Sequence, residues 1–160
     1  MWGKVGVTWI TRTINLMLSG EYEHTLDDKN RLTLPARFRP RFAEGLVLTR
    51  GMDNCLSIYT KEEFSCSIEA RLAELDPLSR ESRLMHRFYF SGTVEAVPDR
   101  QGRVMVPQAL IQSAGFTREV MVVGVLDHLE IWDRGAWRDY MKQVEENVED
   151  AAERLAAKRD

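Results

Sequence analysis

The sequence D-D-K-N-R-L-T-L-P, from Asp27 to Pro35, occurs again 72 positions later as D-R-Q-G-R-V-M-V-P, from Asp99 to Pro107. An aspartate, an arginine and a proline hold the same places in both stretches. Further along, C-L-S-I-Y from Cys55 to Tyr59 matches H-L-E-I-W from His128 to Trp132, now at an offset of 73. One short match arises easily by chance, but ordered matches at separate places do not. The chain therefore contains a duplicated unit of about 50 residues.

Both copies predict the same order of elements. A short strand leads into a tight turn at Asn30 or Gly102, two residue types that tolerate a positive φ. A returning strand follows, and then a proline that suits the first position of a short helix. Two more strands and a longer helix complete each copy. The expected strands are 21–26, 32–34, 46–49 and 55–59 in the first copy, and 93–97, 104–106, 120–125 and 128–132 in the second.

Capping residues mark the ends of the expected helices. Gly115 stands where the C-terminus of a helix adopts left-handed geometry. Thr60 and Glu63 have the spacing of a capping box, and Asp133 is an equally good N-cap in the second copy. The expected helices are 36–42 and 108–114, two longer helices that start after Thr60 and Asp133, and a connector at 78–90.

The predicted organisation has five parts. Residues 1–16 form an N-terminal extension, which we expect to be poorly ordered. Residues 17–75 form a first β-rich module, 76–90 a connecting helix, 91–144 a second module, and 145–160 an acidic tail that we expect to be a frayed helix. A module of about 50 residues buries too little surface to be stable alone. We therefore expect the two modules to share one core.

The composition predicts a soluble globular protein, since 44% of the residues are hydrophobic and 29% are charged. The net charge of −3 argues mildly against nucleic acid as a partner, but a local basic patch can coexist with an acidic tail. The apolar run in residues 2–18 is broken and too polar for a signal peptide or a membrane span, so we expect a cytoplasmic protein with no membrane partner. Cys55 and Cys66 lack metal-binding or redox spacing, so no metal is predicted and both thiols are expected to be structural, as small buried hydrophobes.

No catalytic motif is present in the sequence. The three histidines, His24, His86 and His128, fall in different elements, and none has a serine or cysteine in a nucleophile motif beside it. Phosphate-binding glycine loops and zinc-protease motifs are absent from the sequence as well. We therefore expect neither enzymatic activity nor a cofactor. An enzyme that uses His128 or a thiol stays open as the least favoured alternative.

A cluster of basic residues in the first copy is the strongest chemical signal. Five cations lie within thirteen residues, against one neighbouring acid, Asp28: they are Lys29, Arg31, Arg37, Arg39 and Arg41. An arginine on a two-stranded ribbon can reach guanine in the major groove, while Lys29 and the helix arginines could contact phosphates. Alternatively, the helix arginines form a solvated face and Arg31 is paired with Asp27 across its own turn.

The second copy is less basic. It offers Arg100 and Arg103, with Arg118 further off, so the two copies are not electrostatically equal. Asp27 and Asp99 each precede their arginine by four residues, and a charge-assisted bond between the two would fix the guanidinium in one orientation. The same pair could equally be a structural salt bridge that closes the hairpin. The sequence does not separate these two roles.

The chain resembles the MraZ family, whose members carry a DxxxR signature in each of two tandem halves. The signatures here are 27–31 and 99–103, and the resemblance runs from about Met17 to about Tyr140. Asn30 stands where the first signature usually has glycine, and 1–16 precedes the usual start of the family. The resemblance implies a β-rich α+β fold, namely a duplicated swapped-hairpin double-split β-barrel of the SpoVT-AbrB type with flanking short helices, assembled into a ring-shaped homo-oligomer.

The same resemblance implies a sequence-specific, DNA-binding transcriptional regulator. Members act as repressors at the promoter of the division and cell-wall gene cluster, where they bind direct repeats in double-stranded DNA, which places the protein in the cytoplasm at the nucleoid. The implied DNA-binding residues are Arg31 and Arg103 as readers, Asp27 and Asp99 as orienting partners, and Lys29 and Arg37 nearby. Barrels of this type also occur in antitoxins, so a protein-interaction module that regulates a partner enzyme or toxin is the alternative.

Overall fold

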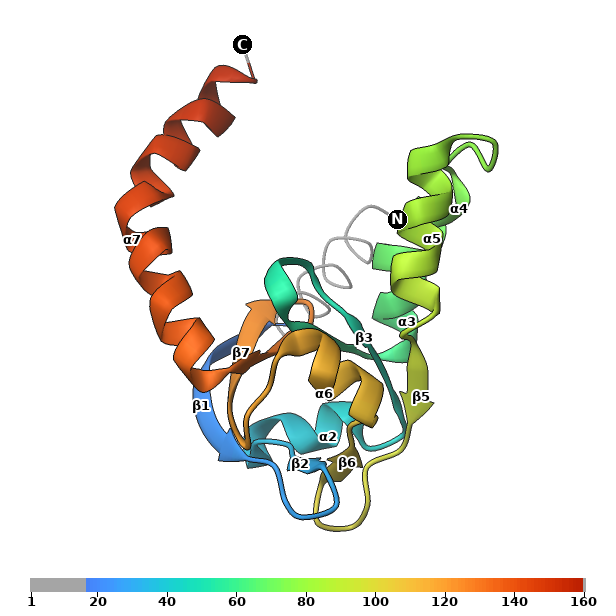
Figure 1. The fold of residues 1–160 in the computed structure, drawn as a ribbon, viewed down its shortest axis with the longest axis vertical. Helices are drawn as coiled ribbons and strands as arrows, with labels where there is room; N and C mark the ends of the chain where they lie inside the picture. The colour runs from blue at the N-terminus through green and yellow to red at the C-terminus, as the bar shows by residue number, and fades with distance from the viewer. Residues whose placement is uncertain (1–16, 160) are drawn as a thin grey trace, which may run out of the picture.

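The computed structural model describes residues 17–159, and the expected N-terminal extension lies outside these residues. The chain forms a strand-rich α+β fold with one open six-stranded sheet, a two-stranded sheet and several helices (Figure 1). The first copy supplies β1 (Leu18–Thr25), β2 (Arg31–Thr33), β3 (Leu46–Arg50) and β4 (Leu56–Tyr59). The second copy supplies β5 (Val94–Ala96), β6 (Arg103–Met105), β7 (Glu119–Leu126) and β8 (Leu129–Asp133).

The large sheet has the order β1-β7-β8-β4-β3-β5, so that each copy contributes one edge strand and one inner pair, and all pairs are antiparallel. β1 pairs with β7 over its whole length, from Leu18 opposite Leu126 to Thr25 opposite Glu119. In the same way, β5 of the second copy pairs with β3 of the first. If each strand is exchanged for its counterpart in the other copy, the same order results when it is read from the opposite edge of the sheet. The duplication has therefore produced a pseudo-twofold sheet with β4 and β8 at its centre.

The returning strands, β2 and β6, pair with each other rather than with the strands that precede them. The sequence predicted a tight hairpin in each copy, and the turns are present, but the two arms of each hairpin pair with the other copy. Beyond the turn, the N–H of Leu34 donates to Gly102 O at 2.8 Å, and the N–H of Val106 donates to Asn30 O at 2.9 Å. This exchange lets the apolar side chains of both copies enter one interior, which neither copy could enclose alone.

The main core confirms that the modules share their interior. It contains fully buried side chains from both copies, which include Leu32, Leu34, Phe42, Leu48 and Ile58 from the first copy and Val104, Val106, Val120 and Ile131 from the second. A second cluster joins Trp132 and Trp137 to Cys55 from the other copy. Truncation of any large member to alanine leaves a cavity that costs about 2 to 5 kcal/mol. Because both copies contribute to the same clusters, we expect them to unfold together.

The helices lie around this core. They are η1 (Ala36–Phe38), α2 (Arg39–Phe42), η2 (Met52–Asn54), α3 (Lys61–Phe64), η3 (Ser65–Glu69), α4 (Ala70–Ala73), α5 (Arg80–Phe90), α6 (Gln108–Ala114) and α7 (Arg134–Ala157). The expected caps are confirmed, because Thr60 Oγ1 accepts the N–H of Glu63 at 3.1 Å and Asp133 accepts that of Ala136 at 3.1 Å. Gly115 closes α6 with a φ of 66°.

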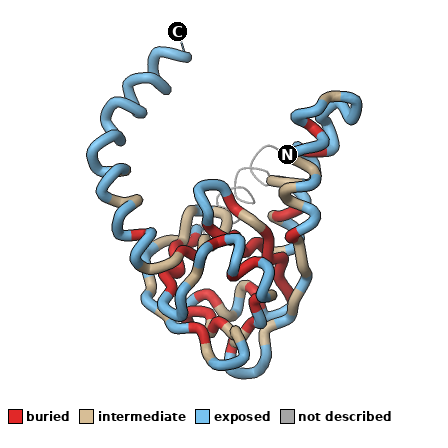
Figure 2. The backbone as a smooth tube through the Cα atoms, viewed as in Figure 1, coloured by how far each residue is buried: buried red, intermediate tan, exposed pale blue. Residues whose placement is uncertain are grey.

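Two helical arms extend from the same side of the sheet, α7 on one flank and the α4–α5 pair on the other (Figure 1). Beyond its first turns α7 is exposed (Figure 2), and it continues as a regular helix to Ala157 where a frayed tail was expected. Cys55 is buried, but Cys66 is exposed, so the prediction of a buried thiol was wrong for Cys66, which lies on the outer face of its helix. None of the helices in residues 17–159 is both long and apolar enough to cross a membrane.

Candidate nucleic-acid interface

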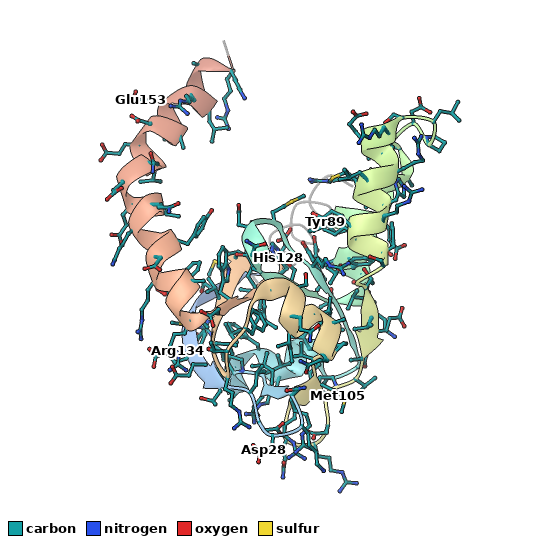
Figure 3. All side chains as sticks on the ribbon, in the orientation of Figure 1. Asp28, Tyr89, Met105, His128, Arg134 and Glu153 are labelled. Carbon is teal, nitrogen blue, oxygen red and sulfur yellow. The ribbon has the colours of Figure 1, made fainter. Side chains whose placement is uncertain are left out.

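Pairing of β2 with β6 brings the two signature turns together. We call residues 27–31 tip 1 and residues 99–103 tip 2. The register places Arg31 opposite Met105 and Arg103 opposite Thr33, so each arginine starts a strand of the shared ribbon. Both tips lie at the end of the molecule opposite the helical arms, where Figure 3 labels Asp28. Two loops that are 72 residues apart in sequence thus form one surface.

In tip 1, one carboxylate organises the whole turn. Asp27 Oδ1 accepts the N–H of Lys29 at 2.9 Å and that of Arg31 at 2.8 Å, while Oδ2 accepts Nε–H of Arg31 at 2.7 Å. Asn30 has the φ of 58° that the turn requires, which an asparagine tolerates better than most side chains. The spacing of four residues is therefore fixed by geometry, since a carboxylate there can hold the turn backbone and the arginine together.

Tip 2 repeats this arrangement. Asp99 Oδ1 accepts the N–H groups of Gln101 and Arg103, both at 2.9 Å, and Oδ2 accepts Nε–H of Arg103 at 2.7 Å. Gly102 has a φ of 78°. The sequence left open whether this aspartate is a structural salt-bridge partner or an orienting partner of the arginine. The structure gives it both roles, because it closes the turn and also fixes the orientation of the arginine.

The two signature arginines are held but remain accessible. The side chain of Arg31 is 26% exposed and that of Arg103 is 31% exposed. Toward other residues of the described chain each guanidinium donates only through Nε, so its terminal amino groups stay available to an external acceptor. A preoriented guanidinium loses less conformational entropy on binding than a free one. The arrangement suits a planar acceptor such as a base edge.

Hydrogen bonds keep both aspartates ionised. The pKa of Asp27 lies below its ordinary value, first because it accepts the backbone N–H of Arg31 and then because of the Arg31 side chain. The pKa of Asp99 is lowered in the same way by Arg103. A lowered carboxylate pKa gives stability that is present above the unfolded pKa and is lost as the pH falls through the folded one. The tips therefore keep their shape throughout the neutral range.

The remaining basic residues do not form one face. Lys29 and Arg100 are exposed at the tips. Arg37, in η1, donates to Tyr22 Oη of β1 at 2.8 Å and lies over the Phe38 ring, so its side chain is directed toward β1. Arg39 donates to Leu34 O at 3.0 Å. The predicted basic patch is thus divided by the fold.

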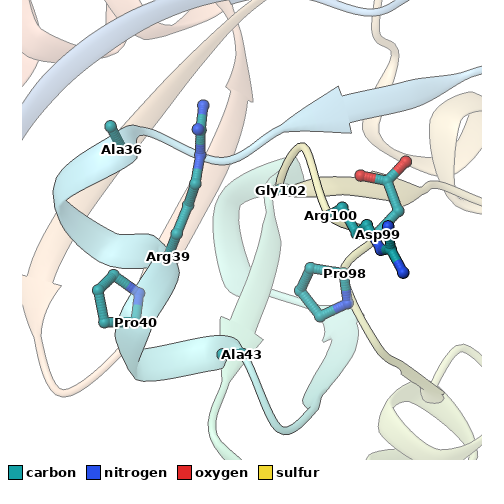
Figure 4. Close-up of a pocket in the computed structure, with 8 residues that line it drawn as sticks. All are labelled: Ala36, Arg39, Pro40, Ala43, Pro98, Asp99, Arg100 and Gly102. Atoms are coloured by element: carbon teal, nitrogen blue, oxygen red, sulfur yellow. The ribbon is translucent and has the colours of Figure 1, made fainter.

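Arg39 lines a hollow of about 510 Å³ beside tip 2. Ala36, Pro40 and Ala43 of the first copy form one wall, and Pro98, Asp99, Arg100 and Gly102 form the other (Figure 4). A Cβ added to Gly102 would lie 2.5 Å from Arg39 Nε. Glycine at this position thus serves both the positive φ and the close approach of the Arg39 side chain.

Sequence reasoning missed the contacts that the second copy makes with tip 1. Asp28 accepts a hydrogen bond from Nη2 of Arg118, and the N–H of Leu26 donates to Arg118 O at 2.8 Å. Asn30 Nδ2 donates to Gln108 Oε1 at 2.9 Å. No sequence signal connects Asp28 with a residue 90 positions away. Tip 1 is therefore built by both copies.

A separate cluster surrounds His128 in the β7–β8 connection, far from the tips (Figure 3). His128 Nδ1 lies 2.6 Å from Asp127 Oδ1, Nε2 lies 3.7 Å from Glu130 Oε2, and the ring stacks on Tyr59 at 4.6 Å. Cys55 donates to Glu130 at 3.6 Å, and burial raises the pKa of this thiol. An activated nucleophile needs the opposite shift.

This cluster predicts a pH dependence of stability. Burial disfavours the charged imidazole, but the bonds to Glu130 and Asp127 outweigh it and raise the pKa of His128. The stability that His128 contributes is therefore fully present at pH values below its pKa in the unfolded chain. It is lost as the pH rises through its pKa in the folded protein. In urea denaturation, we expect the stability of the wild type to fall as the pH rises above about 6.5, the ordinary pKa of histidine, and we expect His128→Gln to remove part of that loss.

His24 is the matched control, because burial, with Arg39 and Arg134, lowers its pKa. His24→Gln should change the same pH profile with the opposite sign. An identical profile for the wild type and His128→Gln would contradict the assigned role.

A protein-family model matches the chain twice, over residues 17–88 and over residues 89–159. The model is that of the MraZ protein, which its description compares with antitoxins. The two matches begin 72 residues apart, which is the offset between the two signatures. Together they cover all of the described chain, and each contains one tip.

Proposed function

Because the chain belongs to the MraZ family, we propose that it regulates transcription by binding double-stranded DNA with tip 1 and tip 2. The observation that supports this most strongly is the pair of aspartate-held arginines at neighbouring turns, 2.7 Å from their carboxylates in both copies. A fixed guanidinium can donate two parallel hydrogen bonds to guanine O6 and N7, the commonest specific contact in the major groove. That groove admits a two-stranded ribbon such as β2 with β6. The proposal needs no cofactor, metal or catalytic step.

Each predicted residue has a defined part in this proposal. Arg31 and Arg103 read bases, and Asp27 and Asp99 orient them. Lys29 in tip 1 and Arg100 in tip 2 contact phosphates, which sets affinity and salt dependence rather than base preference. Arg37 lies outside the tips, beside Tyr22 on β1, and contacts phosphate from there. As a repressor, the protein binds direct repeats at the promoter of the division and cell-wall genes, in the cytoplasm at the nucleoid.

The finer fold is part of the same proposal. β1 and β5 are exchanged between the copies, β2 and β6 interlock, and the sheet is pseudo-twofold. These features support the swapped-hairpin double-split β-barrel of the SpoVT-AbrB type. In such a barrel the tips project from one end, which leaves them free to enter a groove.

Selection from random DNA tests the function. The purified chain is incubated with a random duplex library at two salt concentrations, and the retained fragments are sequenced. We expect enrichment of a short guanine-containing motif that occurs as direct repeats, with retention that falls as salt rises. Failure to retain any duplex at low salt would reject DNA binding.

We propose a ring-shaped homo-oligomer as the working form. On α7, Val144, Val148, Ala151 and Leu155 follow the four-three-four spacing of a helix-packing seam, and Val148 and Leu155 are 53% and 64% exposed. Acidic residues border this seam, while α5 on the opposite arm carries Arg80, Arg83 and Arg87. A contact between α7 of one protein chain and α5 of the next chain is head-to-tail, and repeated head-to-tail contacts can close into a ring. Light scattering tests this, and a molar mass of 18.5 kDa, that of one chain, would contradict it.

A protein-interaction module remains the second candidate, favoured by the exposed seam on α7 and by the antitoxin-like description of the family. It predicts recovery of one stoichiometric protein partner. It also predicts that promoter DNA does not retain the chain at low salt. The DNA selection therefore separates the two candidates.

A further inference from the structure

We propose that Arg118 is a positioning residue of the DNA-binding surface, which neutralises Asp28 so that tip 1 can approach the phosphate backbone as tip 2 does. This inference rests on the proposed function. It concerns a residue of the second copy that acts on the tip of the first. Neither signature contains it.

The fold holds Arg118 beside tip 1. Its carbonyl accepts the N–H of Leu26, the residue before the tip, at 2.8 Å. Its guanidinium Nη2 donates to Asp28 Oδ1. Arg118 lies between α6 and β7, and β7 pairs with β1 along the strand that leads into the tip. The position of Arg118 therefore follows from the strand exchange.

The charges of the two tips explain what this contact does. Tip 1 has two carboxylates and two cations, since Asp28 stands where tip 2 has Arg100. Taken alone, it has no net charge. Tip 2 has one carboxylate, Asp99, and two cations, so its net charge is +1. Arg118 raises tip 1 to the same +1. The difference in charge between the two tips is thus removed by a residue that only the fold brings near.

A second contact shows the same pattern. Asn30 replaces the glycine of tip 2, and its side chain is bound by Gln108, also from the second copy. The counterpart of Gln108 in the first copy is Ala36, which has no polar group to offer tip 2. Two of the three departures of tip 1 from tip 2, Asp28 and Asn30, are therefore matched by side chains of the second copy, and the third is Lys29 in place of Gln101.

The contact matters for binding more than for stability. The side chains of Arg118 and Asp28 are 63% and 93% exposed, and exposed ion pairs contribute little to folding. A bare carboxylate at the tip would, however, face the phosphates of an approaching duplex, and like charges disfavour association. Asp28 without Arg118 would therefore weaken DNA binding while the fold stayed intact.

A double-mutant cycle in the full-length chain tests the inference. DNA affinity is measured at low salt for Arg118→Ala, Asp28→Asn, the double variant and the wild type, with a duplex that the wild type retains. We expect Arg118→Ala to weaken binding about three- to tenfold, but to have less than about a twofold effect in the Asp28→Asn background. Arg118→Lys should restore most of the affinity, because it keeps the charge.

Arg138 provides a matched control. It is also an exposed arginine paired with a carboxylate, Glu23 at 3.4 Å, but it lies on α7 away from the tips. Arg138→Ala should leave DNA affinity unchanged, which excludes an effect of net charge alone. Equal losses from Arg118→Ala in both backgrounds would overturn the inference, since Arg118 would then act independently of Asp28. The inference would also be overturned if Arg118→Ala bound DNA as tightly as the wild type while Arg31→Ala bound it weakly. That result would leave the proposed function intact.

Discussion

Replacing Arg31 and Arg103 with alanine is expected to remove the base preference of the protein and to leave only weak, salt-sensitive binding. Each arginine should contribute about 1 to 3 kcal/mol of discrimination, because its fixed guanidinium can form a bidentate pair with guanine. The measurement is a competition between the selected duplex and a scrambled duplex of equal composition. Each single variant should lose base preference at only part of the bound motif, because each tip contacts its own bases.

Two further variants separate base reading from charge. Arg31→Lys keeps the charge but loses the planar fork, so it should lose preference while retaining affinity for scrambled DNA. Lys29→Ala should lower affinity evenly across sequences and reduce the dependence on salt. If the double arginine variant still preferred the selected duplex, reading by the tips would be rejected.

Gly124→Ala is expected to cause the largest loss of stability among glycine substitutions in the large sheet. A Cβ at this position on β7 would lie 2.3 Å from the backbone nitrogen of Ser19 and 2.6 Å from the carbonyl carbon of Leu18. These atoms belong to the backbone of β1 and cannot move without loss of pairing. We expect the free energy of unfolding to fall by about 1 to 3 kcal/mol or more, measured by urea denaturation.

Gly135→Ala is the matched control for this prediction. A Cβ there would meet only Asp133 Oδ2 at 3.4 Å, and the position is helical, so alanine should stabilise the protein by up to about 1 kcal/mol. The same substitution thus has opposite signs at two glycines. Wild-type stability of Gly124→Ala would contradict the close pairing of β1 with β7.

Local interactions explain why so much of each tip could be predicted. The contacts of Asp27 with Lys29 and Arg31 span at most four residues, so their spacing is written in the sequence. The same holds for the Thr60 and Asp133 caps and for the left-handed Gly115. Each of these bonds forms within one turn of the chain and needs no distant partner.

The basic residues after Pro35 show where such reasoning stops. Arg37 and Arg39 are two residues apart in sequence and were expected to share one role, yet Arg37 binds Tyr22 and Arg39 binds Leu34 O. Cys66 is exposed although Cys55, the other thiol, is buried. The sequence shows which residues are charged or apolar, but the direction in which each side chain points depends on the elements packed around it.

The amino-acid sequence by itself determined the duplication, the two Asp-to-Arg turns, and the strands and caps near them, because these depend on hydrogen bonds and periodicity over a few residues. Only the tertiary structure decided that β1 and β5 cross into the other copy and that Arg118 reaches Asp28. An alternating apolar strand can pair with several partners at similar local cost. The choice among them is made by how much apolar surface the whole chain buries, and that quantity is not visible in any short stretch.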